Sequence, residues 1–98
     1  MAERRDPAEL QAEADLQWVL GDRRGRRVLW RLIAAADVWG RIRAPNPDIH
    51  YREGRREIGI ELMEWIDSAD AAMIPLMMQE SRNEDLRNDR RSNPRHHR

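Results

Sequence analysis

The stretch that most constrains the fold runs from Tyr51 to Ala69 and reads YREGRREIGIELMEWIDSA. Its apolar residues recur at steps of three and four, which places them on one side of an α-helix. The set consists of Tyr51, Ile58, Leu62, Trp65, Ile66 and Ala69. The spacing therefore predicts the central helix of a small all-α protein, with this side, Trp65 included, packed into the core.

Two glycines, Gly54 and Gly59, interrupt this predicted helix. Each costs about 1 kcal/mol of helix stability relative to Ala. A helix tolerates that cost where another backbone or a large side chain comes close. We therefore expect a neighbour at these positions, with Trp30 or Trp39 packed against Gly54.

Capping signals divide the rest of the chain into helices. Asp6-Pro7 is a typical helix start and Gly21 a typical stop, and Asp22 can cap a second helix that Gly40 ends. Asn46-Pro47 begins the third helix, and either Asp67 or Asp70 can cap a fourth. The sequence thus predicts a bundle of three main helices plus a C-terminal fourth in one domain, residues 1–87, with helices at about 7–20, 23–39, 47–68 and 71–87.

The fourth helix and the tail are the least regular parts of the pattern. Pro75 lies too deep for a comfortable helix that begins at Ala71. The helix therefore begins nearer Ile74 or opens with an irregular turn. Residues 88–98 are polar and rich in Arg and His, which predicts a tail without structure of its own in the free protein.

Composition and motifs argue against several chemistries. The chain has no Cys, so it can form neither a disulfide nor a thiolate nucleophile. His50, His96 and His97 have no evident third metal ligand, and no metalloprotease, phosphate-loop or serine-nucleophile motif is present. No apolar segment approaches the ~20 residues of a membrane span, and no signal peptide is expected. We expect no enzymatic activity, no cofactor and no membrane association.

Charge is balanced in total but segregated along the chain. Eighteen basic residues, all Arg, match eighteen acids. Residues 1–22 carry a net charge of −4, residues 23–56 carry +7, residues 57–70 carry −5 and residues 71–98 carry +2. Three interpretations stay open: solvated helix faces paired inside the fold, complementary surfaces that drive ordered assembly, and a phosphate-binding patch.

A cluster of arginines at the start of the second predicted helix is the candidate phosphate contact, because Arg binds phosphate in a bidentate fashion. Its members are Arg23, Arg24, Arg26 and Arg27. Only one turn precedes the apolar residues that begin at Val28, which is too short for a base-reading helix. Non-specific contact with packaged DNA is therefore the nucleic-acid role to consider.

Three further residues are candidates for protein contacts. Trp30 lies on the flank of its helix, where it either reaches a partner or packs beneath Arg side chains of its own domain. Met77 and Met78 belong to an adaptable apolar surface. Packing in the core is the default interpretation for both methionines, and a protein-docking face is the alternative.

Two segments resemble a known family. The first is DLQWVLG at residues 15–21 followed by GRRVLWRL at residues 25–32, and the second is YREGRREIG at residues 51–59. Together they resemble small podophage-type proteins of tailed bacteriophages and prophages, in which a GRRxxWRL helix precedes an (F/Y)REGRRxxG helix. The resemblance extends over roughly residues 15–80. Pro75 and the Arg/His-rich tail depart from the pattern.

The resemblance implies a virion component. Genes of this family typically lie near the portal and major capsid genes, which implies a multi-copy structural or assembly protein of the head, portal or neck (head–tail connector) region, assembled in the host cytoplasm. The expected partners are portal, capsid or neck proteins and copies of the chain itself. The alternatives are a transient scaffold or chaperone and a DNA-contacting internal or ejected protein. The family assigns no catalytic residues.

The second motif also supplies the candidate contact element. Its arginines, Arg52, Arg55 and Arg56, would pair with acids of a neighbouring copy or hold the helix-two loop of the same chain. Glu53 is a further candidate for protein contact.

Overall fold

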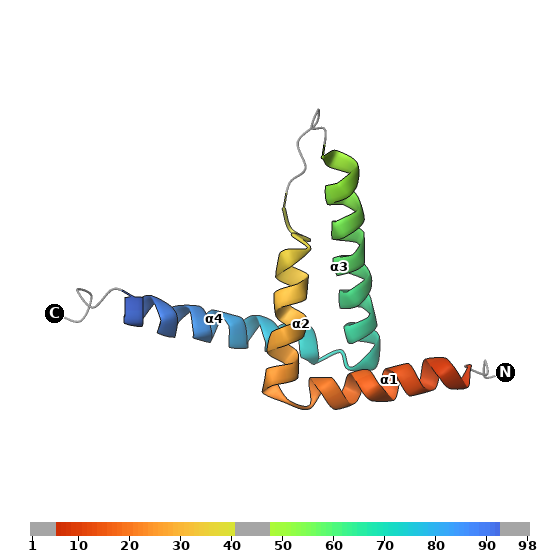
Figure 1. The fold of residues 1–98 in the computed structure, drawn as a ribbon. Coiled ribbons are helices and arrows are strands. Elements are labelled where there is room, and N and C mark those ends of the chain that lie inside the picture. Colours follow the sequence, from red (N-terminus) through yellow and green to blue (C-terminus); the bar gives the residue numbers. More distant parts are fainter. Residues whose placement is uncertain (1–5, 41–47, 93–98) are drawn as a thin grey trace.

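The computed structural model describes residues 6–40 and 48–92, and the regular structure in those residues is helical. The helices are α1 (Pro7–Leu20), α2 (Arg23–Ala35), α3 (Ile49–Ala69) and α4 (Met73–Ser92). α2 and α3 form an antiparallel hairpin, and α1 and α4 cross its base and extend in opposite directions (Figure 1). The predicted all-α fold is confirmed.

Short polar side chains cap three of the helices. Asp6 Oδ1 accepts a hydrogen bond from the Ala8 amide at 3.2 Å, and Asp22 Oδ1 accepts one from the Arg24 amide at 2.8 Å. Asp70 does the same for Ala72 at 3.0 Å, ahead of α4. Each bond satisfies an amide that the first turn leaves without a partner. The predicted boundary at residues 20–23 is correct.

The second helix ends earlier than predicted. It stops at Ala35 and not at residue 39, and a turn occupies residues 36–39. Asp37 has a φ of 55°, a left-handed conformation that Asp tolerates better than most residues and that cannot continue a helix. α3 begins at Ile49. The predicted start at Asn46-Pro47 lies outside the described residues.

The fourth helix begins and ends later than predicted. It starts at Met73, two residues after the predicted bound of 71 and nearer Ile74, as one of the two alternatives for Pro75 had it, so Pro75 is its third residue. The first amides of a helix have no intrahelical partner, so a proline at this position breaks no hydrogen bond. The helix continues to Ser92, so residues 88–92 of the predicted tail are helical. His96 and His97 lie outside the described residues.

A small core joins all four helices at the base of the hairpin. Ile33 of α2 and Ile66 of α3 have no exposed surface, and Met77 of α4 is 1% exposed. α1 contributes Leu16 and Leu20, while Ala36 and Val38 come from the turn after α2. A core of this size supplies little surplus stability.

The predicted buried side of α3 is wrong in detail. Tyr51 is 70% exposed, Ile58 is 68% exposed and Trp65 is 44% exposed. Ile66 is buried as predicted, but the other buried position of the helix is Gly59. The helix is therefore rotated by about one residue relative to the side that the apolar spacing indicated, and Trp65 lies at the surface.

The two glycines of α3 have different environments. A Cβ built on Gly59 would lie 2.5 Å from Ala36 Cβ and 2.6 Å from Val38 Cγ2, so Gly59 is the point where the turn after α2 meets α3. Nothing lies within 4 Å of a Cβ built on Gly54. The expectation of a close neighbour is confirmed for Gly59, and the predicted tryptophan contact at Gly54 is wrong.

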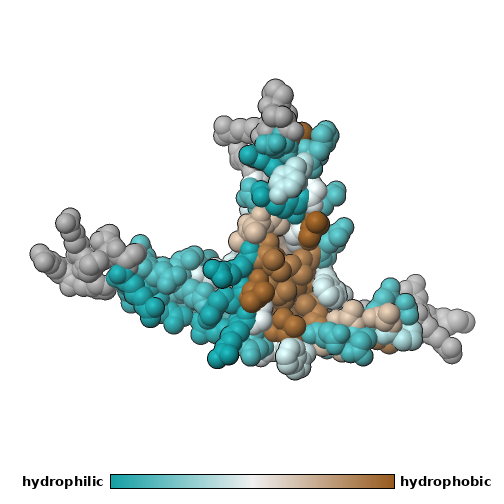
Figure 2. All heavy atoms as spheres, in the orientation of Figure 1, coloured by the Kyte–Doolittle hydropathy of each residue, from teal (hydrophilic) through white to brown (hydrophobic). Residues whose placement is uncertain are grey.

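The molecule is flat and extended. Its principal extents are 63 × 40 × 18 Å, and its radius of gyration is 17.3 Å, against about 13 Å for a compact domain of 100 residues. In the part of the chain that the structure describes, no helix combines the length and apolar character needed to cross a bilayer. A flat shape leaves two broad faces, of which Figure 2 shows one with an apolar centre over the hairpin and the inner end of α1.

Candidate functional site

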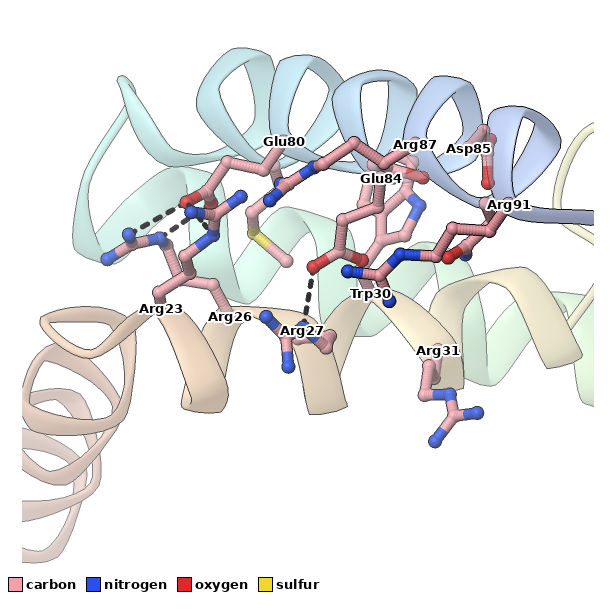
Figure 3. Close-up of a pocket in the computed structure, with 13 residues that line it drawn as sticks. Arg23, Arg26, Arg27, Trp30, Arg31, Glu80, Glu84, Asp85, Arg87 and Arg91 are labelled. Atoms are coloured by element: carbon pink, nitrogen blue, oxygen red, sulfur yellow. Dashed lines mark hydrogen bonds and ion pairs between the residues drawn. The ribbon is translucent and has the colours of Figure 1, made fainter. Parts of the chain in front are cut away.

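The first candidate site is a charged groove of about 610 Å³ between α2 and α4. Arg26 forms a bidentate pair with Glu80, with Nε to Oε1 at 2.8 Å and NH2 to Oε2 at 2.9 Å. Its remaining nitrogen donates to the Leu20 carbonyl at 2.8 Å. Figure 3 shows Arg23 on the other side of Glu80 and Arg27 paired with Glu84. Arg23 Nε lies 3.5 Å from Glu80 Oε2, and Arg27 Nε lies 2.7 Å from Glu84 Oε1.

The Arg26–Glu80 pair is the strongest electrostatic contact of the groove. The two side chains are only 15% and 18% exposed. The hydrogen bond from Arg26 lowers the pKa of the Glu80 carboxyl, which partial burial alone would raise, and the charges of Arg26, Arg23 and Arg27 lower it further. The same pair raises the pKa of Arg26. Glu80 therefore stays ionised and fastens α4 to the start of α2.

Three of the four candidate phosphate contacts bind carboxylates within the fold. Arg23, Arg26 and Arg27 hold acids of α4, so the basic block is neutralised in part inside the fold. Arg24 is exposed, and its backbone amide is the one that Asp22 caps. The arrangement matches the interpretation of solvated faces with internal pairing, and a phosphate ligand would have to compete with the carboxylates of α4 for the other three.

The aromatic and methionine candidates are divided between core and surface. Trp30 is half-buried against the core, lines the groove beside Arg side chains, and lies 5.8 Å from the ring of Trp39 at an interplanar angle of 41°. Met77 is in the core, as its default interpretation had it. Met78 is 43% exposed, so its default interpretation as a core residue is wrong, and the alternative of a docking face stays a prediction.

The contact element of the second motif is partly used within the chain. Arg56 Nε donates to the Val38 carbonyl at 2.9 Å, which fastens the turn after α2 to α3 and follows the same-chain alternative. The Arg55 guanidinium lies 5.6 Å from the centre of the Tyr51 ring. Arg52 and Glu53 are exposed. Arg56 of this element therefore stabilises the upper part of the hairpin, while the charges of Arg52 and Glu53 stay exposed beside it.

The second candidate site is an uncovered apolar surface on the hairpin. On α2, Val28 and Leu32 are 57% and 54% exposed, although they continue the apolar face that buries Ile33. On α3, Ile58 and Trp65 are exposed and flank the half-buried Leu62. We call this surface the hairpin face, and it consists of Val28, Leu32, Ile58, Leu62 and Trp65.

Helix handedness places these residues on one side of the hairpin. Each of them immediately precedes a buried or half-buried residue of its own helix: Leu29, Ile33, Gly59, Met63 and Ile66. In two right-handed helices that run antiparallel, the positions just before the buried stripe point to the same side of the pair. Residues on the other side of α2, such as Arg26 and Trp30, face α4 (Figure 3).

The hairpin face was not predicted from the sequence. The apolar residues of α2 span roughly 160° of the helix circumference, more than the ~100° stripe that one packed face needs. That excess width was the available signal. Glu80 was also missed, although Glu80 and Glu84 are four residues apart and match the spacing of Arg23 and Arg27 on α2.

The described residues contain no group of three or more His, Asp or Glu side chains arranged to hold a metal ion. What the fold and both surfaces define is a small, flat, all-α protein whose distinctive features are contact surfaces.

A comparison with protein families identifies the class further. The family model of Bbp19-like phage protein matches residues 16–79, which is more than half of the chain. The chain belongs to this family of phage proteins, and the resemblance drawn from the GRRVLWRL and YREGRREIG motifs is confirmed. No curated protein and no solved structure matches the chain.

Proposed function

We propose that this protein is a structural or assembly component of the phage particle, present in several copies in the head, portal or neck region and acting through protein–protein contacts without enzymatic activity. The uncovered hairpin face carries the proposal. Contiguous exposed apolar surface rimmed by polar residues is typical of interaction sites. Membership of a phage family supports the setting.

The shape and the core support the same proposal. A flat molecule with seven buried apolar side chains among its described residues gains stability from binding, because a partner that binds only the folded state shifts the folding equilibrium. The expected partners are portal, capsid or neck proteins and other copies of the chain. Assembly would take place in the host cytoplasm.

One experiment distinguishes a structural component from a transient scaffold or chaperone. Mature particles and empty precursors of the encoding phage are purified, and this protein is quantified by mass spectrometry against the portal protein. A fixed ratio in both supports a structural component. Presence in precursors alone identifies a transient scaffold or chaperone. Absence from both rejects the proposal.

The DNA-contacting alternative has less support, because three of the four clustered arginines hold carboxylates of α4. It is tested by binding to duplex DNA over a range of salt concentrations. Neutralising several phosphates would give a steep negative slope of log affinity against log salt. We expect no binding at physiological salt.

A further inference from the structure

We propose that the hairpin face is the contact surface of a homodimer, in which α2 of each copy packs against α3 of the other to form a four-helix bundle. The inference rests on the proposed function, since it names a second copy as one of the partners. The two copies would be related by a two-fold axis parallel to the hairpin helices.

The two sides of α2 differ in what covers them. One side of α2 is covered by α4, whereas Val28 and Leu32 on the other side have no covering helix in the described part of the chain. Two helices with apolar residues on an open side form half of a four-helix bundle. A second hairpin, placed face to face with the first, completes it without moving any helix.

Charge decides in favour of a second copy. The outer edge of α2, between the charged groove and the hairpin face, carries Arg31, which borders the groove. The opposite edge of the hairpin face, on α3, carries Glu61. Both side chains are exposed, and neither has a salt bridge or hydrogen bond within the residues that the structure describes. Figure 3 shows Arg31 pointing away from α4 and its acids. Each copy therefore offers one basic and one acidic edge around an apolar centre.

The edges also fix the symmetry. A two-fold axis parallel to the helices places α2 of one copy opposite α3 of the other, so the basic edge meets the acidic edge twice. An axis across the helices would place α2 against α2 and oppose like charges, which is unfavourable. Isologous contact through the parallel axis is the arrangement in which apolar and charged residues both match.

The heights of the two residues agree with this pairing. Ala36 and Gly59 are in contact, which sets α2 and α3 in register. Arg31 is five residues below that level on α2 and Glu61 is two residues below it on α3, about 7.5 Å and 3 Å at 1.5 Å per residue. Rotation about an axis parallel to the helices keeps heights unchanged. The difference of about 4.5 Å is within the reach of an arginine side chain.

The size of the surface predicts a weak dimer. α2 has 13 residues, about 20 Å at 1.5 Å per residue, and the face is two helices wide only over that length. It therefore measures roughly 20 × 20 Å, and two copies would bury about 800 Å² in total, the size of a weak, transient contact. Such an interface predicts a dimer that dissociates in the micromolar range, about 1–100 μM.

The apolar contact is tested by analytical ultracentrifugation of the full chain over that range. The wild type should sediment as a monomer–dimer equilibrium, and Leu32→Asp should remain a monomer. Leu86→Asp is the matched control, because Leu86 on α4 is 55% exposed, as Leu32 is at 54%, but lies outside the hairpin face. It should dimerise like the wild type. A monomeric wild type, larger oligomers only, or equal effects of both variants would overturn the proposal.

The charged contact is tested by reversal and rescue. Arg31→Glu or Glu61→Arg alone should each weaken the dimer about tenfold, because two attractive pairs become repulsive. The double variant should return to within about threefold of the wild type. The two residues lie on opposite edges of one copy, so rescue reports a contact between copies. Two single-variant effects that add without rescue contradict the two-fold arrangement.

Failure here is distinct from failure of the proposed function. A monomeric protein found at a fixed ratio in particles would reject the dimer and leave the virion role in place. A purified dimer that is absent from all particles would reject the virion role and leave the dimer in place.

Discussion

Replacement of the two glycines of α3 by alanine should have opposite effects on stability. Gly59→Ala would introduce a Cβ at 2.5 Å from Ala36 Cβ and 2.6 Å from Val38 Cγ2, about 1 Å closer than carbon atoms in contact lie. One neighbour is the short side chain of a turn residue, and neither can swing away as a long side chain would. The turn after α2 must therefore move away from α3.

The size of the effect follows from two opposing contributions. Overpacking in a well-packed region costs about 1–3 kcal/mol. The better helix propensity of Ala returns about 1 kcal/mol. At Gly59 the net expectation is a loss of up to about 2 kcal/mol, or a fall of up to about 8–16 °C in Tm for a domain of this size. At Gly54, where nothing lies within 4 Å, only the propensity acts, and Tm should rise by about 4–8 °C.

The measurement is thermal and urea unfolding of both variants by circular dichroism. Protein concentration is held constant, because self-association makes Tm depend on it. Gly54→Ala controls for helix propensity, since it changes the same residue type in the same helix. A Gly59→Ala variant as stable as Gly54→Ala would refute the packing of the turn against α3.

Two further predictions concern α4. Glu80→Gln should lower stability at neutral pH by about 1.5–3 kcal/mol, because Arg26 loses a charged hydrogen-bond partner. The pKa of Glu80 is lowered in the fold, so its contribution is present above the ordinary carboxyl pKa of about 4.3 and is lost as the pH falls through the lowered value. Urea unfolding should therefore separate wild type and variant at pH 7 and bring them together in acid; a constant gap contradicts this. Met77→Ala should cost about 2–5 kcal/mol, since Met77 is 1% exposed, and Met78→Ala should cost less than about 0.5 kcal/mol; similar losses in the same unfolding assay would place both methionines in one environment.

Features that depend on neighbours in the chain could be predicted from the sequence. Asp6 and Asp22 cap helices because a short side-chain oxygen reaches an amide two residues later, an interaction that needs no tertiary structure. Gly21 follows the last residue of α1 as predicted, but with a φ of −71° it does not use the left-handed conformation that glycine favours. These signals located the corner between α1 and α2 and the all-α class.

Features that depend on distant residues could not be predicted in the same way. The buried side of α3 differs from the predicted side by about one residue, and its centre is Gly59, which has no side chain and so adds nothing to an apolar pattern. Glu80 binds Arg26 across 54 positions of sequence. Asp37 ends α2 through a left-handed conformation that many other turn residues can also adopt.

The hairpin face could not be predicted either, because its residues are apolar but exposed. An apolar residue in a helix indicates burial, but it does not say whether the covering surface comes from the same chain. Val28 and Leu32 fit the apolar pattern of α2, and the structure leaves them more than half exposed. The sequence pattern thus includes the residues of the hairpin face, but only the fold shows which apolar residues are exposed and which form the core.

The proposed function requires that the hairpin face brings this protein into the phage particle. The most direct test is the number of copies per portal in purified particles of phages that carry Leu32→Asp or Leu86→Asp, two changes at equally exposed leucines. With both variants expressed at the wild-type level, we expect Leu86→Asp at the wild-type ratio and Leu32→Asp depleted. Incorporation of Leu32→Asp at the wild-type ratio would show that the hairpin face is not needed for entry into the particle.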